Sequence, residues 1–113
     1  MPHCIIEYSN DLAELVTPRE LIDAVYAGTE ESKMFENDDI KVRAISYAHH
    51  KTVNDKYGFI HVTLKTLAGR SWLKKQKLSG LVLNKLAELP SFNIHITVEV
   101  LEMEVASYSK LVK

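Results

Sequence analysis

Apolar and polar residues alternate along three stretches of the chain, in the pattern of strands with one buried face. The stretches are 40–47 (IKVRAISY), 59–65 (FIHVTLK) and 93–100 (NIHITVEV). A period of two residues places every second side chain on the same face, so each stretch predicts a half-buried β-strand. The opening segment 3–8 (HCIIEY) is short, rich in isoleucine and followed by a turn-like SND tripeptide, and it predicts a fourth strand.

Two stretches with helical spacing lie between these strands. TPRE (17–20) is a capping box with proline at the first helical position, and the helix that it starts is predicted to end at Gly28. The second helix follows the turn 66–71 and continues to about Leu89, because Pro90 cannot extend a helix.

The order of elements is strand, helix, strand in each half of the chain. Two such units, about residues 2–47 and 58–100, predict one α+β domain over residues 1–113. Right-handed crossovers would place the four strands in one sheet with both helices on one face. The polar segments 29–39 and 48–58 are predicted to be loops.

The face of the sheet without helices carries apolar residues among polar ones. The two-residue period places Ile5, Ile45 and Phe59 on this face. We expect other subunits to cover part of it, because soluble proteins rarely leave extended apolar surface exposed to water.

The composition argues against several classes of protein. The formal net charge is −1 at pH 7, so nothing draws the whole chain toward nucleic acid or an anionic membrane. No run approaches the roughly 18 apolar residues of a membrane span, and no signal peptide is apparent, which favours a cytoplasmic protein. The single cysteine, Cys4, excludes an internal disulfide and is predicted to be a small buried apolar residue.

The second residue is the strongest candidate for chemistry. A small residue at position 2 lets the initiator methionine be removed, which leaves Pro2 with a free secondary amine. Such an amine acts as a base near neutral pH when burial and nearby cations disfavour its charged form. Lys41 and Arg43 share one face of a predicted strand, and Arg70 lies in the turn before the second helix. These cations would also bind an anionic carbon acid and stabilise its enolate.

A plainer interpretation of the same residues stays open on the pattern alone. Proline is common at position 2, and Lys41 and Arg43 on a strand are more often part of a solvated or interface face. The histidines show no metal-ligand spacing, so no metal site is predicted. The aromatic residues have few basic neighbours, which argues against a nucleic acid partner.

Three segments together resemble the 5-carboxymethyl-2-hydroxymuconate isomerase family of the tautomerase superfamily. They are PHCIIEYS (2–9), IKVRAISY (40–47) and FIHVTLKTLAGRS (59–71), and the resemblance extends from Pro2 to about Val100. It implies two β-α-β units in each subunit of a homotrimer that needs no cofactor. Pro2 would be the general acid and base that moves a proton between carbons of an unsaturated 2-hydroxy or 2-keto dicarboxylic acid.

The resemblance also implies roles for the basic residues. Arg70 falls on a substrate-binding arginine of the AGRS block, and Arg43 falls on a second basic position of the cationic strand. Lys41 stands where an arginine is expected, which keeps the charge but loses the bidentate fork. This departure keeps open another main reaction, such as hydration or decarboxylation of an unsaturated acid. A non-catalytic oligomeric binding protein also stays open, because fold alone does not fix function.

Intact mass spectrometry checks the N-terminus on which the enzyme interpretation depends. We expect the purified protein to have the mass of the chain without Met1, because proline at position 2 permits removal of the methionine. A chain that keeps Met1 would hold Pro2 in an ordinary peptide bond, and would contradict a catalytic amine in that preparation.

Overall fold

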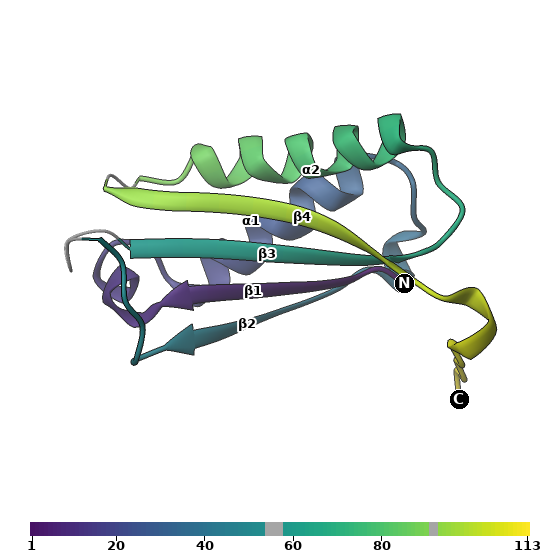
Figure 1. Cartoon of the computed structure of the whole chain (residues 1–113), viewed down its shortest axis with the longest axis horizontal. Coiled ribbons are helices and arrows are strands. Elements are labelled where there is room, and N and C mark those ends of the chain that lie inside the picture. The colour runs from purple at the N-terminus through teal and green to yellow at the C-terminus, as the bar shows by residue number, and fades with distance from the viewer. Residues whose placement is uncertain (54–57, 91–92) are drawn as a thin grey trace.

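The computed structural model describes residues 1–53, 58–90 and 93–113, and it has the predicted order of strands and helices (Figure 1). The strands are β1 (His3–Ser9), β2 (Lys41–Tyr47), β3 (Gly58–Leu67) and β4 (Ile94–Met103). The helices are α1 (Pro18–Glu31) and α2 (Trp72–Ala87). Short 3-10 turns lie at Asn10–Glu14, Asn37–Asp39 and Val105–Ser107.

The four strands form one mixed sheet in the order β2-β1-β3-β4. β1 pairs in parallel with β2, β3 pairs in parallel with β4, and the two pairs join through the antiparallel contact of β1 with β3. His3 therefore lies opposite Lys41 on one side and Lys65 on the other. The starts of β1 and β2 and the end of β3 meet at the same end of the sheet, which confirms the predicted α+β architecture.

The hydrophobic core lies between the sheet and the two helices, which cover one face (Figure 1). Cys4 and Ile6 of β1 pack with Leu21 and Val25 of α1 and with Val82 of α2. Cys4 is fully buried, as predicted, and its Sγ lies 3.7 Å from the Thr29 hydroxyl oxygen. Burial raises the pKa of the Cys4 thiol to about 11, so the residue is a packing group and not a nucleophile.

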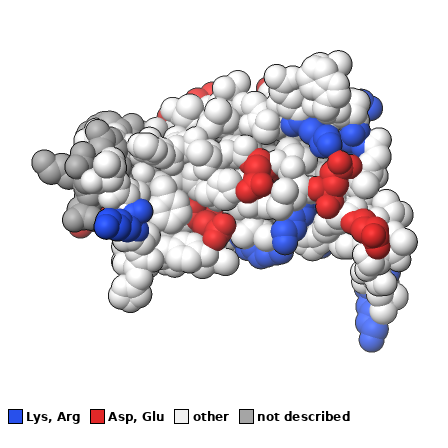
Figure 2. All heavy atoms as spheres, in the orientation of Figure 1, with Lys and Arg blue, Asp and Glu red and all other residues white. Residues whose placement is uncertain are grey.

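The opposite face of the sheet is open to solvent in the single chain. Ile45 of β2 and Leu101 of β4 are 48% and 45% exposed on it. Polar contacts lie between them, including the 2.6 Å contact of His61 Nε2 with Glu99 Oε2. On the visible side of the molecule, acidic and basic side chains lie next to one another at one end, and larger areas without Lys, Arg, Asp or Glu lie elsewhere (Figure 2). This surface agrees with the expectation of apolar residues set among polar ones.

The first helix begins as predicted and ends later than predicted. Thr17 and Glu20 form the reciprocal capping box at its start. The prediction that Gly28 ends the helix was wrong, because α1 continues to Glu31 and turns the start of the expected 29–39 loop into helix. Lys33 follows the helix and adopts the left-handed conformation, with φ of 57°.

Gly28 instead permits close contact between the two helices. A Cβ atom at this position would lie 2.8 Å from the Val82 Cα and 3.0 Å from the Leu81 carbonyl oxygen. Both neighbours are backbone atoms of α2, so they cannot move aside as a flexible side chain would. The glycine therefore sets the distance between α1 and α2.

A pair of glycine substitutions tests this packing. We expect Gly28→Ala to lower the free energy of unfolding by about 1–3 kcal/mol, because the added methyl group overpacks the contact between helices. Gly80→Ala is the matched control, since Gly80 also lies in a helix and its Cβ would meet nothing within 4 Å. That control should stabilise the protein by roughly 0.5–1 kcal/mol. Urea unfolding measures the free energy of unfolding of both variants. Equal changes in Gly28→Ala and Gly80→Ala would contradict the packing role of Gly28.

Candidate active site

The N-terminus is held at the end of the sheet by backbone pairing. Pro2 is buried and directly precedes β1. Its carbonyl oxygen accepts a hydrogen bond of 3.1 Å from the backbone N–H of Lys41, the first residue of β2. The next residue, His3, is already paired on both sides. The start of the chain is thus fixed in position, although chain termini usually fray.

The amine of Met1 lies in a partly buried and mainly polar environment. It donates a hydrogen bond of 2.6 Å to the backbone carbonyl of Asp39 and lies 3.7 Å from that residue's Oδ1. Burial lowers the pKa of this amine, the Asp39 carboxylate raises it, and the positive charges of Lys41 and Lys110 lower it further. The net effect is that the pKa of the Met1 amine is lowered. The Met1 amine is therefore shifted toward its neutral, basic form.

The C-terminal tail returns to this end of the sheet and pairs with the same carboxylate. Lys110 Nζ lies 2.6 Å from Asp39 Oδ1, the oxygen that also faces the Met1 amine. The hydrogen bond from Lys110 is the main reason why the pKa of Asp39 is lowered. Lys110 thus partly neutralises the Asp39 carboxylate, which favours the charged form of the amine.

Arg70 is positioned by the turn between β3 and α2. Gly69 takes φ of 125° there, a conformation that favours glycine. The guanidinium Nη1 donates to the Leu67 carbonyl and Nη2 to the Met34 carbonyl, each at 3.3 Å. It also lies 4.6 Å from the ring centroid of Phe35. These contacts fix the plane of the guanidinium group before any ligand binds.

Met1 and Arg70 line the same hollow, which has a volume of about 330 Å³, and among the described residues Pro2 is not part of its lining. Met34, Phe35 and Leu67 supply apolar parts of its wall. The charged groups around it are mixed, because Glu36, Asp39 and Lys33 also line it. An amine with a lowered pKa and a fixed guanidinium, which line one hollow, offer a base and an anion-binding group at one small, partly apolar site.

Two of the predicted site residues lie on the open face of the sheet. Arg43 Nη1 lies 3.2 Å from His3 Nδ1, and Lys41 Nζ lies 3.1 Å from the Asp39 carbonyl oxygen. A guanidinium only donates, so His3 Nδ1 accepts and its Nε2–H donates to the Tyr108 hydroxyl at 2.9 Å. Burial, followed by the charge of Arg43, lowers the pKa of His3, which agrees with this neutral ring. Neither Lys41 nor Arg43 lines the hollow that Arg70 shares with the N-terminus.

Sequence reasoning missed Asp39, Lys110 and Phe35. Asp39 belongs to the polar segment 29–39, which was expected to be a loop, and Lys110 lies in the tail after the last predicted strand. The only available signal was the apolar pair Met34-Phe35 inside the polar segment 29–39. Nothing local in the sequence indicated that these residues meet the N-terminus.

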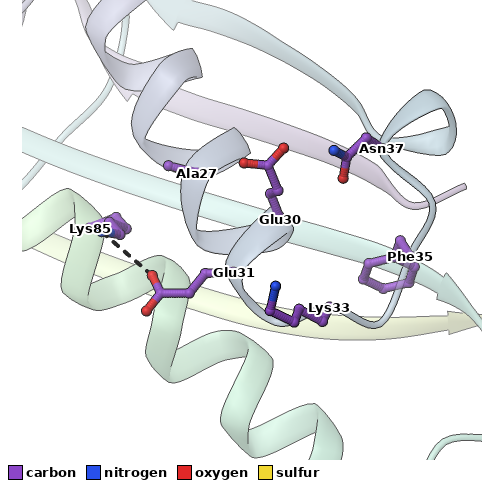
Figure 3. A pocket seen from close by; sticks show the side chains of 7 residues that line it. All are labelled: Ala27, Glu30, Glu31, Lys33, Phe35, Asn37 and Lys85. Atoms are coloured by element: carbon purple, nitrogen blue, oxygen red, sulfur yellow. Dashed lines mark ion pairs between the residues drawn. The ribbon is translucent and has the colours of Figure 1, made fainter.

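A neighbouring hollow of about 570 Å³ lies beside the end of α1, and it has a different character. Figure 3 shows Glu31 reaching toward Lys85 of α2, a pair separated by 3.5 Å, with Glu30 nearby. Its opposite charges are paired or mixed. In the part of the chain that the structure describes, no group of three or more metal-binding side chains occurs, and no helix is long and apolar enough to cross a membrane.

Solved structures with the same architecture define the class of protein. A 5-carboxymethyl-2-hydroxymuconate isomerase from Deinococcus radiodurans R1 superposes with a TM-score of 0.75 at 20% identity, over 99% of this chain and 90% of that chain. A 5-carboxymethyl-2-hydroxymuconate delta-isomerase gives a TM-score of 0.74 at 19% identity, over 100% of this chain and 89% of that chain. A fused 4-OT protein described as a symmetric trimer superposes with a TM-score of 0.67 at 12% identity, over 93% of this chain and 92% of that chain. The fold is that of the tautomerase superfamily.

The family follows from the sequence match. The family model of 5-carboxymethyl-2-hydroxymuconate isomerase matches residues 2–110, from Pro2 through the C-terminal tail. This chain belongs to that family, whose members are isomerases of the tautomerase superfamily. No curated protein sequence matches the chain significantly.

Opposite substitutions at Asp39 and Lys110 test the charge balance at the amine. In a preparation that keeps Met1, we expect Asp39→Asn to lower the pKa of the amine, because a negative neighbour is removed. Lys110→Ala should raise this pKa, because a positive neighbour is removed and Asp39 is freed. The pH dependence of acetylation by trace acetic anhydride measures both shifts.

Lys113→Ala is the control for loss of a tail charge, because Lys113 is exposed. It should leave the pH midpoint of acetylation unchanged. Shifts of the same sign in the Asp39 and Lys110 variants would contradict the shared-carboxylate arrangement.

Proposed function

We propose that the protein is a cofactor-independent isomerase that moves a proton between carbons of a small unsaturated 2-hydroxy or 2-keto dicarboxylic acid. The best-supported substrate is of the 5-carboxymethyl-2-hydroxymuconate type. Pro2, freed of Met1, would be the general acid and base, and Arg70 would bind a substrate carboxylate. The observation that carries this proposal is the hollow lined by both Arg70 and Met1, the residue directly before Pro2, in a chain of this family.

The proton transfer needs one group that acts first as a base and then as an acid. The nitrogen lone pair of Pro2 would take a proton from the substrate, and the electrons of the broken bond would move into the conjugated carbonyl. The resulting dienolate would then take the same proton back at another carbon, which restores the neutral amine. The reaction is redox-neutral, and a base whose pKa lies near the working pH suits both steps. The lowered pKa of the Met1 amine at this end of the sheet supports such a base.

Arg70 has the geometry expected of a preorganised carboxylate-binding group. Two of its N–H groups bond to the Leu67 and Met34 carbonyls, and a guanidinium has five donors. The remaining donors are available to a substrate without rotation of the side chain. Binding a carboxylate here would hold the conjugated system against the apolar wall of Phe35, and would stabilise negative charge as it develops.

Lys41 and Arg43 have separate roles in this proposal. Lys41 would act through its charge, because it lies near the N-terminus and lowers the pKa of the amine there. Arg43 lies on the open sheet face, so its substrate-binding role would be at the site of a neighbouring subunit. A homotrimer that covers this face would bring subunits together, and exposed Ile45 and Leu101 support such a contact.

Changes at Pro2 and Arg70 separate chemistry from binding. A Gly-Ser extension before Pro2 should lower kcat by about 10²–10⁴-fold while the assembly survives, because it converts the amine into an amide. Arg70→Ala should raise KM for a dienol dicarboxylate by roughly 10–100-fold, the loss expected for a charge-assisted hydrogen bond. Ketonisation followed by ultraviolet absorbance gives both constants.

Arg70→Lys is the control that keeps the positive charge and loses the bidentate geometry of the guanidinium group. Its KM should lie between those of the wild type and Arg70→Ala. Size-exclusion chromatography checks that each variant keeps its assembly. Full turnover in the extended protein would exclude the amine as the reacting group and would favour a non-catalytic role for Pro2.

A further inference from the structure

A second hollow, of about 620 Å³, continues from Arg70 toward α2. It is lined by the cationic side chains of Lys33, Arg70, Lys74 and Lys77, together with small residues of the β3–α2 turn. No carboxylate lines it, whereas Glu36 and Asp39 line the hollow at the N-terminus. Glu30 and Glu31 line the hollow beside α1 together with lysines, so both of those hollows have mixed charge and only the second hollow is lined by cations alone among its charged residues.

Lys74 and Lys77 of this hollow differ from two neighbouring lysines on the same helix, which form ion pairs. Lys75 lies 2.8 Å from Glu102, and Lys85 lies 3.5 Å from Glu31. Within residues 1–53, 58–90 and 93–113, the ammonium groups of Lys74 and Lys77 have no carboxylate or hydrogen-bond partner. Their charges are therefore available to an anionic ligand.

The basic hollow adjoins the hollow at the N-terminus. Both hollows are lined by Lys33, Met34 and Arg70, so the guanidinium group lies on their common wall. The first turn of α2 contains no acidic residue and carries Lys74, which opposes the helix dipole. The chain thus keeps positive charge at a position where local helix stability disfavours it, directly beside Arg70.

We propose that Lys74 and Lys77 form a subsite for a further carboxylate of the substrate, beyond the carboxylate held by Arg70. This inference rests on the proposed function, because it extends the same site. The ligand class is a small polycarboxylate whose second anionic group reaches past the reacting carbons. The compound after which the family is named fits this class, since it carries a carboxymethyl group in addition to the carboxylates of a muconate.

The subsite makes the enzyme selective by charge and not by shape. Lysine ammonium groups are mobile point charges, so they attract a carboxylate without fixing its plane. Arg70 would set the orientation of the substrate, and the lysines would add affinity for substrates with an extra negative charge. A substrate with a single carboxylate would bind at Arg70 alone and would gain nothing from the lysines.

The first test compares two double variants of equal charge. Lys74→Gln/Lys77→Gln removes the subsite, and Lys75→Gln/Lys85→Gln removes two charges from the same helix outside the hollow. Calorimetry with propane-1,2,3-tricarboxylate should show about tenfold weaker binding in the subsite variant and less than a twofold change in the control. Inorganic phosphate is the second probe, and its binding should be weak and change little.

Two outcomes of the binding test would overturn the inference. Equal losses of affinity for the tricarboxylate in both double variants would show a general effect of net charge. Phosphate that binds as tightly as the tricarboxylate, with the same loss in the subsite variant, would show an anion site unrelated to the substrate. Thermal unfolding of both double variants checks that each one is folded.

Kinetics distinguish failure of this inference from failure of the proposed function. The ratio of kcat/KM for a dienol polycarboxylate to that for a dienol monocarboxylate should fall about tenfold in the subsite variant and stay unchanged in the control. An unchanged ratio in an active enzyme would overturn the subsite and leave the isomerase proposal intact. If the wild-type protein turns over no dienol acid, the proposed function fails, and the tricarboxylate measurement still decides whether these lysines bind carboxylates.

Discussion

The pairing of β1 with strands on both sides is the constraint on which the site depends. β1 lies between β2 and β3, and the hydrogen bond from the Lys41 N–H to the Pro2 carbonyl extends this pairing to the residue before the strand. A chain terminus held in this way keeps its position without a dedicated binding loop. The antiparallel contact with β3 then brings the β3–α2 turn, and with it Arg70, to the same end of the sheet.

Opposing charges set the state of the amine at this end of the sheet. Burial and the lysines favour the neutral amine, whereas Asp39 favours the ammonium form. Lys110, near the end of the sequence, forms an ion pair with the Asp39 carboxylate, which raises the pKa of the amine. Asp39 therefore has a structural use as an anchor for the chain start and the tail, and its effect on basicity is moderated by its second partner.

Much of the fold was predictable because its signals are local. The alternation in 93–100 and the capping box at Thr17 each report on a few neighbouring residues, and both were confirmed. The end of α1 was predicted wrongly at Gly28, because a glycine that ends a helix and one that permits close helix packing look alike in sequence. The strand β4 also continues to Met103, past the clear alternation, because β3 offers paired positions up to Leu67. The site was less predictable, because Asp39 meets Met1, Lys110 meets Asp39 and Phe35 meets Arg70 only through the tertiary fold.

The most direct test of the account is an NMR titration of the Pro2 nitrogen in the processed protein, labelled with ¹⁵N-proline. A free N-terminal amine has an ordinary pKa of about 8. The account predicts a value clearly below this, with the neutral secondary amine as the main form at neutral pH. A titration midpoint at or above the ordinary value would contradict the claim that the fold holds this terminus as a base.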